Sequence, residues 1–346
     1  MKRLLWIGIL LLITTLPVSA ALPEAPVVPE QAEDYMPDPS NGFGQGIWHI
    51  FITALQQIGP DIAASSKVCL GVIAAVLLMS FLRDMDGKSK LAADLAAVTT
   101  ISALLLHGTG SMISLATETV QQVSQYGKML LPVMTAALAS EGGTVTSAAI
   151  YTGTAIFDAL LSTAISSLLI PVVYLYLAFG IMDTATEEKT LKGMIQFVKW
   201  LMTWILKTIL YIFTGYIGIT GVISGTTDRA ALKATKLAIS GVVPVVGNIL
   251  SDASETILVS AGLLKNTAGI YGLLAVLAIT IGPFLKIGVQ FLLLKLTAGL
   301  CGMIGDGKYR ELIDCFCGAM GMLLAMTGSS CILQLVSTVC FMKGIH

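Results

Sequence analysis

The chain has 346 residues, of which 55% are hydrophobic and 12% are charged, and its formal net charge is −1. Its mean hydropathy is +0.85. Soluble domains carry about a quarter charged residues, so this chain has too few charges to cover the surface of a water-soluble domain. The near-zero net charge gives no basic surface for nucleic acid, and so apolar a chain cannot remain solvated and disordered. The composition therefore indicates a membrane protein.

The N-terminal region has the pattern of an export signal followed by an acidic arm. Two basic residues precede an apolar run over residues 4–16 and a small-residue cleavage site at Ala20. Cleavage there is the favoured interpretation, because the run is short for a bilayer span, and an uncleaved anchor is the alternative. We expect residues 1–20 to be the signal peptide and residues 21–45, rich in proline and acids, to be an extended arm on the far side of the membrane.

Apolar runs of membrane-helix length fill the rest of the chain. Residues 46–66 are amphipathic and are predicted to lie in the membrane interface, with Trp48 and Phe51 as anchors. For residues 67–346 we expect an all-α polytopic membrane domain of about 6–8 membrane-embedded helices, some of them short and broken by Pro or Gly. The predicted apolar segments are residues 67–82, 91–116, 129–139, 148–182, 195–221, 237–250, 268–304 and 315–342.

Three charged segments separate these runs, at residues 83–90, 183–199 and 306–314. The first carries three cations in eight residues, and the positive-inside rule therefore makes it cytoplasmic, in agreement with an exported N-terminus. A basic segment at residues 229–236 fits less well, because simple alternation of spans would place it outside. Either residues 195–221 return to the cytoplasm as a hairpin, or the basic segment departs from the charge rule.

Short sequence matches recur about 110 residues apart, which favours a parallel internal repeat. Pro132 and Pro244 are 112 residues apart, and so are Pro171 and Pro283. Such units would start and end on the same face of the membrane, as in some transporter folds. The segments that hold Pro132 and Pro244 are too short to cross, so we expect them to line a substrate site or pore, sheltered by protein. The alternative is that they lie in the interface as surface helices.

Four ionisable side chains lie inside apolar runs: Asp158, Lys207, Lys286 and Lys295. A charge at the bilayer centre is costly, so these groups are candidates for an ion or proton pathway or for a salt bridge between repeats. For the lysines, the alternative is that their heads extend to the interface. Asp158 is too short to do so and is the better candidate, with Lys286 or Lys207 as its candidate partner.

No pattern for catalysis or cofactor binding was found. The six cysteines form no CxxC pair, only three histidines are present, and no sequence matches the phosphate-binding loop GxxxxGK[ST]. The cysteines are interpreted as small apolar residues within helices. We therefore expect neither an enzyme nor a cofactor or metal site, and any energy for transport would come from a partner protein.

One long segment carries a family resemblance. Residues 240–258, Ser-Gly-Val-Val-Pro-Val-Val-Gly-Asn-Ile-Leu-Ser-Asp-Ala-Ser-Glu-Thr-Ile-Leu, and their continuation to residue 269 resemble the central motif of the stage III sporulation protein AE family. The signal peptide, the acidic arm and the multi-span remainder are similar to that family as well. The motif residues that the resemblance marks for a structural or pore-adjacent role are Gly241, Pro244, Gly247, Ser251, Asp252, Ser254 and Glu255.

This resemblance implies a mother-cell protein of an endospore-forming bacterium, in the membrane that surrounds the engulfed forespore. It also implies a transenvelope, secretion-like assembly of stage III A-operon proteins, which include a cytoplasmic ATPase and ring-forming proteins, with the forespore stage II sporulation protein Q. We expect a core conduit or permease subunit of this channel. The alternatives are a non-conducting scaffold that docks the ATPase and ring proteins, and a stand-alone secondary transporter. The family implies no catalytic residues.

Overall fold

The computed structural model describes residues 26–38, 42–85, 90–186, 189–242, 247–304 and 307–343. Side chains are described for residues 26–38, 42–81, 94–186, 191–220, 266–303 and 307–343. The regular elements in this part of the chain are helices, namely α2 (Glu30–Glu33), α3 (Phe43–Gln57), α4 (Gly59–Met85), α5 (Lys90–Ser140), α6 (Thr144–Thr163), the π-helical turn η1 (Ala164–Leu169), α7 (Ile170–Thr186), α8 (Lys189–Val242), α9 (Gly247–Ile304) and α10 (Gly307–Lys343). The predicted signal peptide, residues 1–20, lies outside the described residues.

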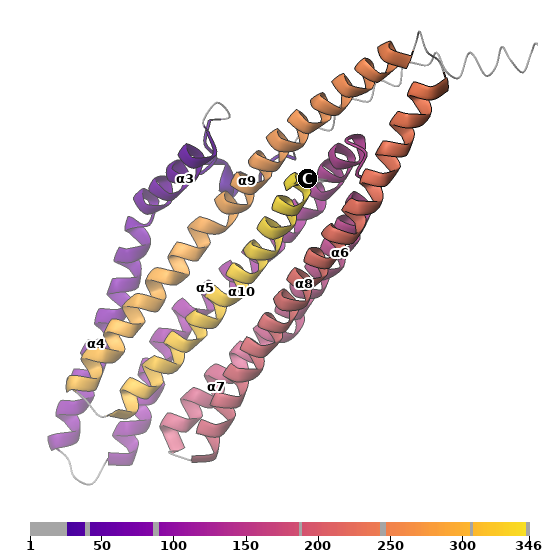
Figure 1. Cartoon of the computed structure of the whole chain (residues 1–346). Coiled ribbons are helices and arrows are strands. Elements are labelled where there is room, and N and C mark those ends of the chain that lie inside the picture. Colours follow the sequence, from indigo (N-terminus) through magenta and orange to yellow (C-terminus); the bar gives the residue numbers. More distant parts are fainter. Residues whose placement is uncertain are drawn as a thin grey trace, which may run out of the picture.

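The helices form one elongated bundle, in which α4, α5, the continuous rod of α6, η1 and α7, and then α8, α9 and α10 run in alternating directions (Figure 1). Six are long and apolar enough to cross a membrane within the described residues, and these candidate spans are Gly59–Phe81, Asp94–Ser140, Thr144–Thr186, Leu191–Thr220, Asn266–Met303 and Gly307–Lys343. The predicted class, an all-α polytopic membrane protein, is confirmed.

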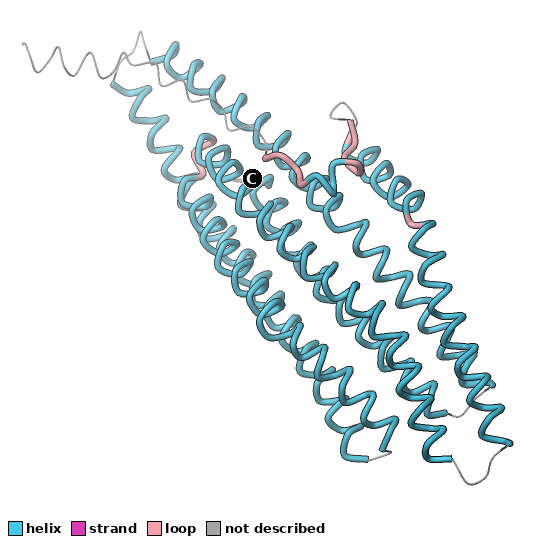
Figure 2. The backbone as a smooth tube through the Cα atoms, turned by 180° about the vertical axis from the view of Figure 1, so that it is seen from behind, coloured by secondary structure: helices cyan, strands magenta, loops and turns pink. Residues whose placement is uncertain are grey.

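The two ends of the bundle differ in charge. The end of α4, the junction of α7 with α8 and the junction of α9 with α10 lie together at one end, here called the charged end (Figure 1, Figure 2). The described residues of the three charged segments therefore lie at the same end of the bundle. The opposite end, here called the arm end, holds α2, α3, the turn between α5 and α6 and the C-terminal end of α10.

The charged segments are more helical than expected. Residues 306–314 were predicted as a loop, but α10 already begins at Gly307, and α8 begins at Lys189. Their charged side chains can therefore pair across helices instead of extending into water. By contrast, the turn between α5 and α6 is sharp, because the Gly142 and Gly143 amides donate to the Ala139 and Leu138 carbonyls at 2.9 and 3.1 Å. Gly142 has φ 96°, a left-handed conformation that favours glycine at a helix C-terminus.

The prediction that Pro132 lies in a short broken segment was wrong. Pro132 lies inside α5, and Pro283 likewise lies inside α9. A proline removes a single backbone donor, and both helices continue through it, although the Pro132 side chain is exposed and that of Pro283 is half-buried. Pro171 follows the π-helical turn η1, whose wider winding makes room for the ring against the preceding turn. The fourth repeat proline, Pro244, falls in residues 243–246, outside the described residues.

The order of the helices agrees with the repeat hypothesis better than the positions of Pro132 and Pro244 do. The pairs α5 with α6–α7 and α8 with α9 are both hairpins that start and end at the charged end (Figure 1). However, Pro132 precedes the end of α5 by two turns, whereas Pro244 follows the end of α8 at Val242.

The segment predicted to lie in the interface is divided between two helices. Helix α3 ends at Gln57, and residues 59–66 already belong to the first crossing helix, α4. Helix α3 packs along α9, where Gly46 lies against the Leu274 side chain. Trp48, predicted as an anchor, is 64% exposed, so it stays available to lipid head groups.

The bundle is longer than a bilayer is thick, since the 51 residues of α5 rise about 77 Å against a hydrocarbon core of about 30 Å. The exposed side chains of α5 change character along the helix. Leu95, Leu104 and Leu106 are exposed on the charged-end side, whereas the exposed residues after Thr117 include Glu118, Gln121, Gln125 and Lys128. Helix α5 is therefore longer than one membrane crossing requires, and its exposed surface becomes more polar after Thr117.

Helices α9 and α10 form the centre of the bundle. In their most apolar windows, 61% and 67% of the residues are buried, compared with 17% in α4. Large side chains such as Tyr126, Phe213, Phe316 and Phe341 are fully buried. The middle of the bundle is thus filled by side chains.

Candidate functional site

A layer of polar side chains joins α5, α6 and α10 in the arm-end half of the bundle. Asp158 of α6 is 3% exposed. Its Oδ2 accepts a hydrogen bond from the Ser124 hydroxyl at 2.6 Å, and its Oδ1 accepts one from the Gln334 amide at 3.0 Å. One turn away, the Thr154 and Ser337 hydroxyl oxygens are 2.6 Å apart. These five residues are here called the Asp158 layer.

A glycine allows α5 and α10 to approach closely at this layer. A Cβ atom at Gly127 would overlap with the side-chain amide of Gln334. Gly153 allows α6 and α8 to approach closely, because a Cβ atom at Gly153 would overlap with the ring of Tyr216. Tyr216 in turn donates a hydrogen bond to the Ala149 carbonyl at 3.1 Å. The glycines therefore set the distances between the helices that carry the layer.

The partners of Asp158 differ from those expected. Neither Lys286 nor Lys207 pairs with it, and its described hydrogen-bond donors, Ser124 and Gln334, are neutral. Neutral donors satisfy a buried carboxyl group without fixing it by a full ion pair. Asp158 also lies level with Ser124, about 10 Å beyond Thr117 along α5, and is sheltered by protein.

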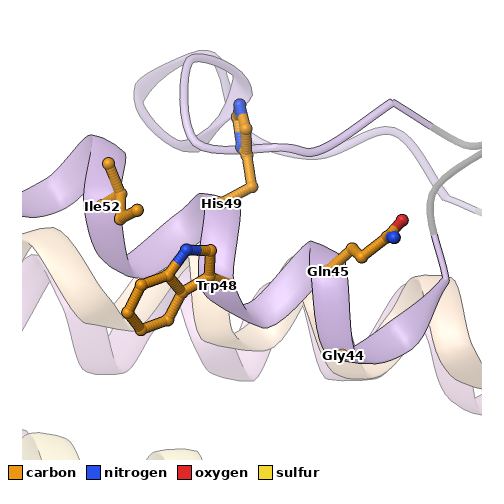
Figure 3. Close-up of a pocket in the computed structure, with 5 residues that line it drawn as sticks. All are labelled: Gly44, Gln45, Trp48, His49 and Ile52. Carbon is orange, nitrogen blue, oxygen red and sulfur yellow. The ribbon is translucent and has the colours of Figure 1, made fainter.

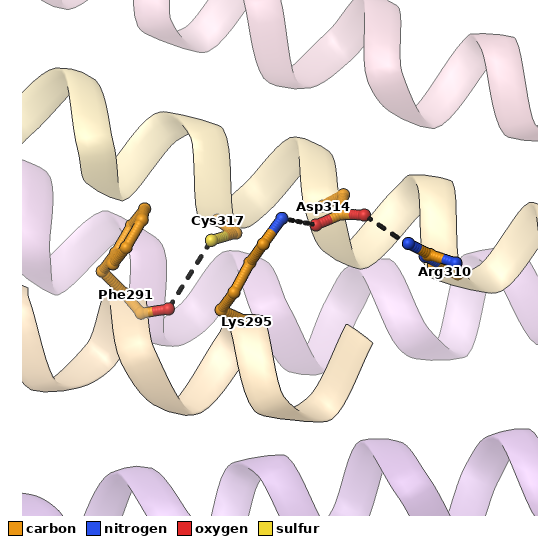
Figure 4. Close-up of polar contacts among 5 residues, drawn as sticks. All are labelled: Phe291, Lys295, Arg310, Asp314 and Cys317. Carbon is orange, nitrogen blue, oxygen red and sulfur yellow. Dashed lines mark hydrogen bonds and ion pairs between the residues drawn. The ribbon is translucent and has the colours of Figure 1, made fainter. Parts of the chain in front are cut away.

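The three lysines have separate environments. Lys286 pairs with Asp61 of α4 at 3.2 Å, and Lys295 pairs with Asp314 of α10 at 2.7 Å. Figure 4 shows that Asp314 uses its other oxygen for Arg310, at 3.7 Å. Lys207 is exposed on α8, as expected for a side chain whose head extends toward an interface. The same view shows the Cys317 thiol donating to the Phe291 carbonyl at 3.5 Å, which is the packing role expected of a buried cysteine.

The family-like motif lies where α8 meets α9. Gly241 is in the last turn of α8, Gly247 opens α9, and Pro244 falls between them, outside the described residues. The side chains of the remaining motif positions, Ser251, Asp252, Ser254 and Glu255, also lie outside the described residues. Helices α8 and α9 extend past the other helices at the arm end (Figure 1). The motif is therefore carried at the far tip of a helical hairpin.

The course of α8 also decides the position of the basic segment at residues 229–236. Helix α8 is continuous from Lys189 to Val242, so residues 195–221 do not return as a hairpin. The basic segment consequently lies toward the arm end, away from the three charged segments.

Described residues line hollows in different parts of the bundle. One, of about 440 Å³, is lined by five residues of α3 alone, with Trp48 and His49 pointing to different sides (Figure 3). A hollow formed by one helix is open and holds little. The other, of about 250 Å³, lies between α7, α8 and α10 at the charged end and is here called the charged-end pocket. The sequence identified its residues only as charged segments, since their meeting depends on helix packing. No group of three or more metal-ligating side chains occurs in the part of the chain that is described.

A comparison with protein families identifies the family of the chain. The family model of stage III sporulation protein AE matches residues 33–344. The chain belongs to the stage III sporulation protein AE family. This match includes the Asp158 layer and the charged-end pocket, and it confirms the resemblance seen in the motif.

A relative supports the same assignment. Stage III sporulation protein AE of Bacillus subtilis (strain 168) is 29% identical over 214 residues, which cover 61% of this chain and 53% of that protein. The chain thus spans about half the length of the curated relative that it matches. No solved structure matches the chain.

Proposed function

We propose that this member of the stage III sporulation protein AE family is a membrane-embedded conduit or permease subunit of the mother cell-to-forespore channel. In this proposal it resides in the mother-cell-derived membrane around the forespore. Its partners are the other stage III A-operon proteins, including the ATPase and the ring proteins, and stage II sporulation protein Q. The family and the six candidate spans support the sporulation and membrane parts of the proposal.

The Asp158 layer is the observation that carries the conduit role. The middle of the bundle is filled, so a passage would open only if α10 moved away from α5 and α6. Apolar surfaces exposed by such a movement would exclude water, whereas the side chains of Ser124, Asp158 and Gln334 could exchange their mutual hydrogen bonds for bonds to water. A polar layer is therefore where a water-filled passage would form at the lowest cost.

Cysteine accessibility tests this role. Ser337→Cys places a thiol of similar size in the layer, and a membrane-impermeant thiol reagent should label it in sporulating cells that contain the complete complex. Labelling should fall when the ATPase is absent. Ala319→Cys, on the same helix in a fully buried apolar position, is the matched control and should stay unlabelled. A Ser337→Cys thiol that remains inaccessible in spore-forming cells would count against the conduit.

A scaffold role is the second candidate, and the filled middle of the bundle favours it. A scaffold would use the charged end to dock the ATPase, so reversing charges in residues 83–90 or 306–314 should abolish assembly. Under this alternative, Asp158→Asn should leave spore yield unchanged, because Asn preserves the shape of the layer. Under the conduit proposal, the same substitution should lower spore yield while the complex still assembles. A stand-alone transporter would instead show sustained transport by the purified chain in liposomes.

A further inference from the structure

The outward side of helix α8 carries a row of exposed side chains. The helix lies at one margin of the bundle in both views (Figure 1, Figure 2). It packs on α6, α7 and α10 through buried residues such as Val198, Leu206 and Phe213. On the other side, residues spaced three or four apart are exposed and share one helical face. This set, here called the α8 row, consists of Trp200, Thr203, Lys207, Tyr211, Thr214 and Gly218.

The α8 row places a cation on the outside of a membrane-crossing helix. A crossing of about 20 residues within the candidate span Leu191–Thr220 includes residues 201–210 wherever it begins, so Lys207 lies at membrane depth in each case. A charged side chain at this depth is costly and normally faces protein or a water-filled cavity. Extension of the ammonium group toward an interface lowers the cost but supplies no counterion.

Lys207 is also the member of the row that lacks a counterpart in the bundle. The hydroxyls of Thr203 and Thr214 donate to the Lys199 and Leu210 carbonyls at 2.9 and 2.8 Å, so they are satisfied within α8. No Asp or Glu occurs between residues 191 and 220. The salt bridges of the described residues likewise include none to Lys207. A carboxylate that neutralises this lysine would therefore come from outside the described bundle.

The shape of the row suits another helix. Trp200 is 58% exposed and Tyr211 is 72% exposed, and the Trp200 ring stacks on the ring of Trp204 with their centres 6.2 Å apart. Such aromatic side chains supply a large contact area. Nothing lies within 4 Å of a Cβ atom at Gly218, and small residues let the backbones of two membrane helices approach closely. The row extends over about 27 Å along α8, close to the thickness of a hydrocarbon core.

Charge distinguishes the possible occupants of the row. Two copies of this chain have the same orientation in one membrane, so a two-fold contact along the row would bring Lys207 against its own counterpart, and like charges repel. A lipid acyl chain brings no counterion to membrane depth. A helix of another protein with a carboxylate on its contact face satisfies both the charge and the shape.

We propose that the α8 row docks one membrane-crossing helix of a partner protein, and that an Asp or Glu side chain of this helix pairs with Lys207. Trp200 and Tyr211 would pack against its apolar residues on either side of the ion pair. Gly218 would allow close approach at one end of the contact. The contact goes beyond the conduit role, because it concerns assembly and is independent of where a passage opens.

Photo-cross-linking in sporulating cells tests the proposal. Tyr211 of the full chain is replaced by the photoreactive analogue p-benzoylphenylalanine, which keeps an aromatic ring in the row. We expect a covalent adduct with a second protein, and mass spectrometry should place it in an apolar crossing helix that contains Asp or Glu. The same replacement of Leu292, which is 59% exposed on α9, is the matched control and should give no protein adduct.

Substitutions of Lys207 test the ion pair itself. In the chain with the analogue at residue 211, Lys207→Gln should lower the adduct yield at least about tenfold, because an acid left unpaired at membrane depth is costly. Lys207→Glu should lower the yield at least as much. Exchange of the acid in the cross-linked helix for lysine should restore the adduct with the Lys207→Glu chain, a recovery that a misfolded chain would not show. Immunoblots of membrane fractions check that each variant reaches the parental level.

Four results would overturn the docking contact. They are the absence of a protein adduct at residue 211, as expected if lipid alone covers the row; an adduct of twice the mass of this chain, which assigns the row to a second copy; an adduct in a helix without Asp or Glu; and a yield that Lys207→Gln leaves unchanged. None of them bears on the conduit, which the Ser337→Cys labelling tests separately. Conversely, an inaccessible Ser337→Cys thiol leaves the contact standing, since a scaffold needs partners as well.

Discussion

The Gln334 amide donates to Asp158 Oδ1 across 3.0 Å, although the two residues are 176 positions apart in the chain. This bond ties the last helix of the bundle to α6. Since Ser124 holds the other carboxylate oxygen, one side chain fixes the relative heights of three helices. Stability and the proposed opening of α10 therefore depend on the same residue.

Asp158→Leu should destabilise the chain more than Asp158→Asn does. Leucine leaves the Ser124 and Gln334 donors buried without a partner, which costs about 1–3 kcal/mol. Asparagine keeps an acceptor for one of the donors and the shape of the layer. Thermal unfolding of the two variants in the same detergent measures the difference. Equal midpoints would mean that the layer contributes nothing to stability.

Gly127→Ala should destabilise the contact between α5 and α10. The new Cβ atom would overlap with the Gln334 side chain, and forcing the helices apart costs about 1–3 kcal/mol. Gly110→Ala is the matched control on the same helix, because nothing lies within 4 Å of a Cβ atom there. The control should be neutral or up to about 1 kcal/mol more stable, since alanine favours helix over glycine. Chemical unfolding of both variants checks the contrast.

The N-terminal arm, residues 26–38, should detach from the bundle at high pH. The Tyr35 ring lies on Gly282 of α9, and burial, more than its charged neighbours, raises the pKa of the Tyr35 hydroxyl above its ordinary value of 10.0. Lys286 opposes this shift, whereas Asp61 and Asp34 add to it. The packed arm therefore favours the neutral hydroxyl. The contribution of Tyr35 to the stability of the packed arm is complete below the unfolded pKa and is lost as the pH rises through the higher folded pKa.

Limited proteolysis of the arm measures this dependence. Cleavage of the parent should increase as the pH rises above about 10. Tyr35→Phe cannot ionise, so its arm should show a smaller increase over the same range, and the difference between the two isolates Tyr35 from the titration of Lys286. Identical pH profiles for the parent and Tyr35→Phe would rule out the role of Tyr35.

Helix α5 should leave the membrane near Thr117. A cysteine at Gln125 should react with an impermeant reagent added from the arm side, because the exposed residues around it are polar. A cysteine at Leu104, which is 39% exposed, should face lipid and react only with a membrane-permeant reagent. Protection of the Gln125→Cys thiol in intact membranes would move the boundary further along the helix. Reporter fusions after residues 120 and 232 check the same side independently.

The sequence by itself determined that most of this protein is surrounded by lipid, and it determined the order of the long apolar helices. Few charges and long apolar runs require lipid, and the cations of residues 83–90 predict that this segment is cytoplasmic. These features follow from local composition, which acts through hydrophobicity over each segment of some twenty residues. The motif at residues 240–258 likewise carried the family assignment before any contact was known.

Only the tertiary structure decided which polar groups meet. Pro132 looked like a break because a proline removes a backbone donor, but α5 continues through it to Ser140. Lys286 was a candidate partner of Asp158. In the packed bundle Lys286 pairs with Asp61, and Asp158 accepts hydrogen bonds from Ser124 and Gln334. The meeting of Asp183, Tyr176 and Lys199 depends on the side-by-side positions of α7 and α8. Such contacts depend on the distances and rotations between helices, which the pattern of a single helix does not specify.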